Sequence, residues 1–382
     1  MPPRAQVNWA CGKKANSSEE ATSMISVGVD VHKRQCAVAI QREDGELASF
    51  APFPNTREGW LGLLEVLPPE AEIALEVSTS GYFAMSVLEE AGWLERAHWV
   101  HTAGIDSLRK QKTDRLDARR LARKLSVADR DPLPEAWFPP PQIRELRLRA
   151  RARCWLAVVR TQVKNRLQSL LQMHGRRPTV SDVFGEAGRA WLAAQAWPAA
   201  TRESLDQLLR LHDFLAFELE KAEGFLRSVD GQFPELARLR TIPGIGEILA
   251  PVIWSEIGRL ERFRSARALV NYTGLAPSLY ESGEVTIRGG ITHQGSAWLR
   301  WALVAAANSA IQGLNPFARR YRRLRRTKPA NVAKTAVARS LAHCVYGVLK
   351  SQTNYQAARW GHRPRAVARS LGAGQPEVAI GH

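Results

Sequence analysis

The sequence predicts an α/β domain followed by a mostly α-helical region, and three features of its hydrophobic pattern support this fold class. Short apolar runs and amphipathic segments alternate between residues 25 and 128, as strands and helices do in turn. Residues 144–173 and 201–229 repeat apolar side chains at helical spacing. From residue 236 onward, short helical segments are separated by turns that contain glycine or proline.

The α/β region begins with a strand at 25–31 that places its branched apolar residues on one face and Asp30 on the other. Further strands are predicted at 35–41, 46–53, 71–77 and 96–102, and helices at 56–66, 79–90 and 104–126. We expect Ser80 or Thr79 to cap the second helix. The resulting order is three strands, helix, strand, helix, strand, helix, which is the order of a RuvC-like or ribonuclease-H-like fold.

These patterns divide the chain into six segments. They are a disordered leader (1–23), the α/β domain (24–131), a Pro-rich linker (132–142), a helical coiled-coil region (143–235), a C-terminal domain (236–355) and a loose tail (356–382). The two long helices of the coiled-coil region are expected to pack antiparallel, with a polar tip around 174–182. Because Met24 directly precedes the first strand, Met1 and Met24 are both candidate translation starts.

The composition favours a polyanionic partner. Lysine and arginine number 54 against 37 aspartates and glutamates, which gives a formal net charge of +17. The 4 cysteines lie far apart without a CxxC pair, which argues against structural zinc and suits a reducing cytoplasm. No apolar run reaches the ~20 residues of a membrane span and the N-terminus lacks a secretory signal, so we expect no membrane contact.

Four carboxylates fall where the predicted α/β domain would gather them. Asp114 and Asp117 are spaced i,i+3 on one helical face, and Asp30 and Glu76 come from two strands. Phosphodiester transfer needs positive charge on the scissile phosphate, and carboxylate oxygens are the ligands that magnesium prefers. A single such residue is more often solvated or salt-bridged. The four together predict a site for Mg²⁺ or Mn²⁺.

Basic residues and two glycines are the candidates for contacts with nucleic acid. One basic run lies between 144 and 166 with Glu145 as its only acid, so we expect it to lack acidic partners and to repel itself unless a polyanion binds. A second run lies at 319–328, and its Tyr321 is a candidate to stack on a base. The string PGIGEILA (243–250) is typical of a helix-hairpin-helix turn, although a plain connecting turn fits it as well. The predicted contacts are Arg144, Arg147, Arg151, Lys164, Arg166, Gly244, Gly246, Arg288, Arg319, Arg322, Arg323 and Arg326.

Ser282 is a candidate nucleophile in the string YESGE, within a loop or small hairpin at 276–292. Taken alone it reads as a turn residue, as most serines beside glycine do. Ser296 is a rival, but it precedes an apolar helix and is expected to be its N-cap. A Ser/His/Asp hydrolase is disfavoured because the chain has no GxSxG elbow.

As a set, these motifs resemble the DEDD transposases of insertion sequences of the IS110 and IS1111 type, which are bridge-RNA-guided serine recombinases. The matching strings are GVDVHK (28–33), LEVSTSGY (75–82), KTDRLDARRLA (112–122), IPGIGEILA (242–250), YTGLAPSLYESGEVTIRGGITHQGSAWLR (272–300) and YGVLK (346–350). They follow the family's order across nearly the whole chain. The leader before Met24 is not explained by the resemblance.

The resemblance implies a role for each matched residue. Asp30, Glu76, Asp114 and Asp117 correspond to the family's metal ligands in a RuvC-like domain, and Ser282 to its nucleophile, which forms a phosphoserine with DNA. It also implies donor and target DNA and a structured bridge RNA as partners. A dimer to tetramer is implied, with each active site shared between the RuvC-like domain of one subunit and the serine domain of another. The expected location is the bacterial cytoplasm, with association to the nucleoid on DNA.

Two other functions fit parts of the sequence. One is a metal-dependent junction-resolving endonuclease that uses water as its nucleophile and needs no serine. The other is a catalytically inactive nucleic-acid-binding protein, against which the intact set of four carboxylates argues.

Overall fold

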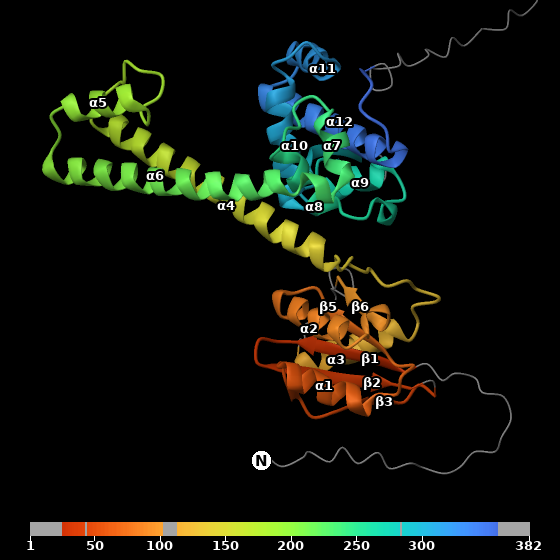
Figure 1. The fold of residues 1–382 in the computed structure, drawn as a ribbon. Helices are drawn as coiled ribbons and strands as arrows, with labels where there is room; N and C mark the ends of the chain where they lie inside the picture. Colours follow the sequence, from red (N-terminus) through yellow and green to blue (C-terminus); the bar gives the residue numbers. More distant parts are fainter. Residues whose placement is uncertain (1–24, 43, 102–112, 283–284, 358–382) are drawn as a thin grey trace, which may run out of the picture. The chain divides into compact units, whose positions relative to one another are not determined.

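The computed structural model describes residues 25–42, 44–101, 113–282 and 285–357 (Figure 1). The chain forms two compact units, which divide between Phe138 and Pro139, inside the Pro-rich segment. The predicted leader and most of the predicted tail lie outside the described residues. Among the helices that are described, none is both long and apolar enough to cross a bilayer.

The first unit contains one mixed β-sheet with the strand order β3-β2-β1-β5-β6, and β4 also pairs with β2. Its strands are β1 (Ser26–Val31), β2 (Gln35–Gln41), β3 (Leu47–Ser49), β4 (Phe53–Pro54), β5 (Glu72–Glu76) and β6 (Ala97–Val100). β1 is antiparallel to β2 and parallel to β5. The single third strand predicted at 46–53 is wrong, because the chain is split there into β3 and β4. Pro52 lies between the two and has no N–H to continue the ladder.

Helices cover both faces of this sheet. They are α1 (Arg57–Val66), α2 (Thr79–Glu90) and α3 (Asp114–Leu125), with a 3₁₀ turn at Leu94–Arg96. Val27, Val29 and Val31 pack with α1 and α2, whereas Ala39 on the other face packs with α3. The predicted alternation along the first strand is therefore confirmed. The cap of α2 is Ser78, whose Oγ accepts from the Gly81 N–H, so the prediction of Ser80 or Thr79 is wrong. Of the helix predicted at 104–126, residues 104–112 lie outside the described residues.

Gly28 lets the backbone of α3 lie directly on β1. A Cβ at this position would lie 2.0 Å from the Ala118 carbonyl oxygen and 2.3 Å from the Ala122 nitrogen. Because both atoms are backbone, Gly28→Ala should force α3 away from the sheet and destabilise the protein by about 2 kcal/mol, measured by urea denaturation. Gly62→Ala in α1 is the matched control, since a Cβ there meets nothing within 4 Å. Equal stability of the two variants would contradict the close packing.

The second unit begins with a helical arm made of α4 (Pro141–Met173), α5 (Glu186–Ala194) and α6 (Ala199–Ser228). α4 and α6 run antiparallel, as predicted, because Arg153 near the start of α4 pairs with Glu223 near the end of α6. Leu171 near the end of α4 and Leu205 near the start of α6 belong to the same buried cluster. Figure 1 shows the arm extending away from the other helices of this unit, with α5 at its far end.

The remainder of the second unit is a helical body that carries one β-hairpin. Its elements are α7 (Pro234–Arg240), α8 (Leu249–Ile257), α9 (Ala266–Thr273), β7 (Pro277–Ser282), β8 (Val285–Ile291), α10 (Ala297–Ala310), α11 (Pro316–Arg325) and α12 (Ala330–Ser351), with 3₁₀ turns at Asp230–Gln232 and Leu260–Arg262. The base of α4 contributes Leu146, Ala150 and Cys154 to the body's core. Of the two alternatives expected at 276–292, a loop or a small hairpin, the structure has the hairpin. Helix α11 was not predicted.

Candidate functional site

Asp30 lies near the end of β1 on the face that α3 covers, and it is only 6% exposed. Burial raises the pKa of its carboxyl, because the charged form loses its hydration. The nearby His32 opposes this effect, and the negative charges of Asp114, Asp117 and Glu76 raise the pKa further. The other three carboxylates singled out in the sequence therefore lie close enough to act on Asp30.

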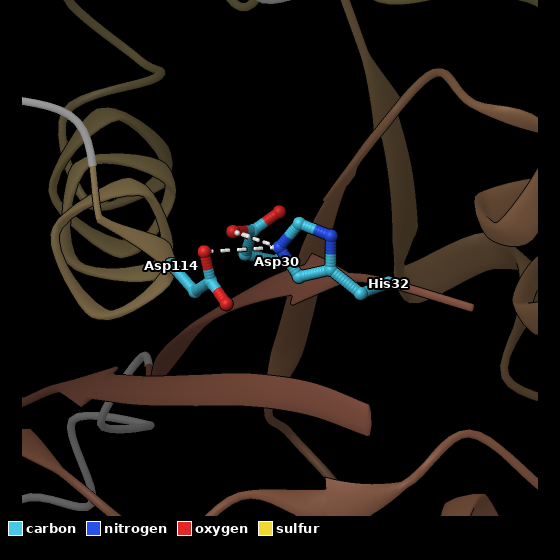
Figure 2. A group of neighbouring side chains, drawn as sticks. All are labelled: Asp30, His32 and Asp114. Atoms are coloured by element: carbon cyan, nitrogen blue, oxygen red, sulfur yellow. Dashed lines mark ion pairs between the residues drawn. The ribbon is translucent and has the colours of Figure 1, made fainter. Parts of the chain in front are cut away.

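His32 lies between two of these carboxylates (Figure 2). Its Nε2 is 3.2 Å from Asp30 Oδ2 and 3.1 Å from Asp114 Oδ1. One donor atom from each of the three residues fits within a span of 4.8 Å. His32 was not predicted as a site residue, although its position two residues after Asp30 was a usable signal, since alternate positions along a strand share a face.

The other two carboxylates are placed differently. Asp114 is the first residue of α3, whose N-cap Thr113 accepts from the Leu116 N–H. Asp117 lies one turn further along, and its Oδ1 accepts a hydrogen bond of 2.8 Å from Arg120. Glu76 ends β5, the parallel neighbour of β1. The structure therefore brings Asp30 and Asp114 into direct contact with one histidine, and Asp117 and Glu76 act on Asp30 through their charge.

The chemistry of this cluster suits a divalent cation. Several carboxylates repel one another around a buried Asp30, and a cation held between them would relieve that repulsion. The donor atoms are carboxylate oxygens and one imidazole nitrogen. Oxygen ligands suit both Mg²⁺ and Mn²⁺, and the imidazole is a better ligand for the second.

A groove of about 790 Å³ adjoins the cluster. His32 and Asp114 line it together with the basic residues Lys33, Arg34 and Arg115. Cationic side chains beside a carboxylate cluster suit a phosphodiester strand, because the cations attract the phosphates along the groove.

Ser282 is the last residue of β7 and pairs with Val285 across the hairpin. Its side chain and that of Arg288 lie outside what the structure describes. Ser296 is the N-cap of α10, as predicted. Its Oγ accepts from the Leu299 N–H and donates to Glu256 Oε2 at 2.9 Å. The Ser296 hydroxyl therefore caps α10 and already has both a donor and an acceptor as partners.

The two glycines of the predicted phosphate-binding turn differ in their surroundings. Gly244 has φ +89°, and a Cβ there would lie 2.2 Å from the Ala306 carbonyl oxygen, so it packs against α10. Gly246 is exposed, and a Cβ there would meet nothing within 4 Å. Of this pair, Gly246 is the more exposed.

The prediction that the basic run on α4 lacks acidic partners is wrong. Arg151 binds the fully buried Glu256 with two hydrogen bonds of 2.6 and 2.9 Å. Arg147 donates to the carbonyl oxygens of Ser255 and Glu256. Burial lowers the pKa of Arg147, although the Glu256 charge opposes this effect. Both arginines join the arm to the body. The sequence did not show this because Glu256 is more than a hundred residues away.

The remaining predicted contacts have other surroundings. Arg144 donates to the Pro139 carbonyl, Lys164 lies over the Phe184 ring, and Arg166 is exposed. Tyr321 is partly buried against the body's core, so only part of its ring is available to a base. The exposed arginines of the second basic run lie on α11 and at its C-cap, and they are Arg319, Arg322, Arg323, Arg325 and Arg326.

Comparisons with known proteins point to one group. Residues 236–322 match the model of the "Transposase IS116/IS110/IS902 family", and residues 27–175 match a DEDD-type IS110 model described as "Transposase". A putative transposase, y4rJ, of Sinorhizobium fredii is 30% identical over 265 residues, which cover 60% of this chain and 66% of that protein. A probable family 20 transposase of Pseudomonas aeruginosa is 24% identical over 302 residues, covering 76% and 87%. The transposase for insertion sequence element IS1328 of Yersinia enterocolitica is 33% identical over 110 residues, covering 28% and 33%.

Proposed function

The chain belongs to the IS110 family of insertion-sequence transposases, and from this premise we propose that it cuts and rejoins DNA through a phosphoserine formed by Ser282, with a divalent metal held in a RuvC-like first unit. The observation that carries the proposal is the carboxylate cluster around Asp30 within the stretch that matches the DEDD model. The hairpin that bears Ser282 lies within the other matched stretch.

The residues of the first unit bind and orient the phosphodiester. Asp30, His32 and Asp114 would hold the cation, with Asp117 and Glu76 adding negative charge around it. When bound, the metal supplies positive charge to the scissile phosphate, as Mg²⁺ or Mn²⁺ can. Lys33, Arg34 and Arg115 in the adjoining groove hold the neighbouring phosphates of the strand.

The reaction conserves phosphate esters. Ser282 Oγ attacks phosphorus and forms a new P–O bond while one ester bond of the DNA breaks, and the serine proton passes to the oxygen that leaves. A hydroxyl of the second strand then attacks the phosphoserine, which restores the DNA ester and the serine. Because each step exchanges one ester for another, no ATP is required, and the chain has no GxxxxGK[ST] loop.

We also propose a guide RNA and a homo-oligomer as partners, on the basis of the family resemblance. The exposed arginines of α11 offer a surface for a nucleic-acid backbone. Large apolar side chains on the arm support self-association, since Trp155, Phe214 and Phe217 are each more than half exposed.

The proposal is tested by looking for a covalent adduct. Protein purified with RNA from cells that carry the whole element is incubated with labelled donor and target DNA and Mg²⁺. Wild type should give a protease-sensitive DNA–protein adduct, and Ser282→Ala should give none. Ser278→Ala is the matched control because it lies on the same hairpin, where its Oγ bonds the Gly290 carbonyl, and it should keep forming the adduct.

Two other outcomes would each support an alternative function. Cleavage without an adduct, unchanged in Ser282→Ala, means that water attacks and that the protein is a metal-dependent junction nuclease. Nucleic-acid binding without cleavage of any substrate, with or without metal, means that the protein is a binding protein alone.

A further inference from the structure

A cavity of about 750 Å³ lies in the second unit among β8, α11 and α12. This volume falls within the usual range of ligand sites. β8 contributes Gly289, Gly290 and Ile291, and α11 contributes Arg320. α12 contributes one face, because its lining residues recur at intervals of three and four positions from Asn331 to His343. The cavity therefore borders the hairpin that carries Ser282.

Positive charge gathers at this cavity. Arg320, Arg339 and His343 line it, and none of the described residues that line it is acidic. Burial, followed by the charges of Arg323 and Arg339, lowers the pKa of Arg320. Burial, followed by Arg339 and Arg320, lowers the pKa of His343. Arg320 and Arg339 repel each other, and a bound anion would remove that repulsion.

The other lining groups are apolar or small. Pro277, Ile291 and Val332 supply apolar surface, and Val332 is 51% exposed. Gly290 is open, because a Cβ there would meet nothing within 4 Å. An apolar wall beside two arginines matches a nucleotide, whose base is flat and weakly polar and whose phosphate is anionic.

We propose that this cavity binds an unpaired nucleotide of the DNA strand that is cut, with its phosphate against Arg320 and Arg339 and its base against Ile291 and Val332. The proposal rests on the proposed function, because it takes Ser282 on the same hairpin to be the group that joins this strand. DNA is favoured over RNA for the same reason: the strand that reaches the hairpin is the one that is cut.

The test measures binding by the full-length protein in EDTA, where cleavage does not occur. Fluorescein-labelled single-stranded DNA and RNA of the same sequence are titrated by anisotropy over a salt series. Arg339→Gln should weaken DNA binding about fivefold near 0.1 M salt and lower the slope of log K against log salt by about 0.7, the value for one lost phosphate contact. Arg267→Gln is the matched control. It removes an exposed arginine of α9 that does not line the cavity, and it should change neither quantity.

Two further measurements place the nucleotide. Val332→Asp puts a negative charge on the exposed wall of the cavity and should weaken DNA binding more than Arg339→Gln does. Photo-crosslinking of a DNA strand that contains 5-iododeoxyuridine should label peptides of β8 or α12. DNA binding by Arg339→Gln equal to that of Arg267→Gln, or labels confined to other elements, overturns the proposal. Loss of RNA binding with DNA binding intact overturns its assignment to the cut strand.

The outcome is separable from that of the adduct experiment. If Ser282→Ala still cuts DNA while Arg339→Gln loses DNA binding, the serine mechanism fails, and the cavity remains a nucleotide site without its assignment to a serine-joined strand. If the adduct depends on Ser282 and both arginine variants bind DNA equally, the mechanism stands and the cavity proposal is wrong.

Discussion

Replacing Asp30 with asparagine is expected to reduce strand cleavage by more than about 100-fold. Loss of a residue that only hydrogen-bonds to a metal ligand costs up to about 100-fold in activity, and loss of a direct ligand should cost more. The folded protein should survive the change. In the folded wild type, burial and three neighbouring negative charges raise the pKa of the Asp30 carboxyl. A raised pKa in the folded state means that ionisation of Asp30 costs stability as the pH rises above its unfolded value. At neutral pH and without metal, Asp30→Asn should therefore be at least as stable as wild type.

Metal-dependent stabilisation gives a readout other than activity. Wild type should show a higher melting temperature as Mn²⁺ is added, since a ligand that binds only the folded state stabilises it, and Asp30→Asn should show little change. Asp129→Asn is the matched control, an exposed aspartate of the same unit outside the cluster, and it should respond as wild type does. Two results would contradict the metal site: cleavage by Asp30→Asn at the wild-type rate, or a wild-type melting temperature that does not change when Mn²⁺ is added.

Replacing Glu256 with alanine is expected to destabilise the second unit by about 3 kcal/mol, at the lower end of the loss caused by breaking a buried ion pair. The fully buried carboxylate accepts both hydrogen bonds from Arg151 and one from the Ser296 hydroxyl. We expect the lower end because the Arg151 side chain is 41% exposed and can regain water when Glu256 is removed. The loss is still large because Ser296 and Arg147 are half-buried and regain less water.

Urea denaturation followed by circular dichroism measures this loss. Glu145→Ala is the control, because Glu145 pairs with Arg149 on the exposed face of the same arm helix, and such a pair contributes less than about 1 kcal/mol. Equal effects of the two substitutions would show that Glu256 does not hold the base of the arm.

The sequence predicted what depends on local pattern. Alternation along β1 separated Val27 and Val29 from Asp30, and the structure places them on opposite faces of the sheet. Ser296 was recognised as a cap because capping needs only a hydroxyl three residues before an amide. The long helices and the hairpin follow from the spacing of apolar residues and from turn residues in the same way.

The sequence did not predict what depends on distant partners or on a weak local signal. The partner of Arg147 and Arg151 was not predicted, because Glu256 lies more than a hundred residues further along the chain. α11 was not predicted because its many arginines leave few apolar positions from which a helical period could be recognised. Asn315 followed by Pro316 was a usable signal for the start of a helix. His32 was left out because the predicted metal site contained carboxylates alone.

The attachment of the arm through Glu256 has a mechanical consequence. α4 contains 33 residues and is therefore about 50 Å long, and its base is held by Arg147 and Arg151. From Arg151 to Met173 the helix rises about 33 Å, so a tilt of about 5° at Arg151 moves the tip by roughly 3 Å. Glu256 thus acts as the fulcrum of a lever. Because Glu256 also accepts a hydrogen bond from Ser296, the cap of α10, a change in the tilt of the arm would act on the start of that helix.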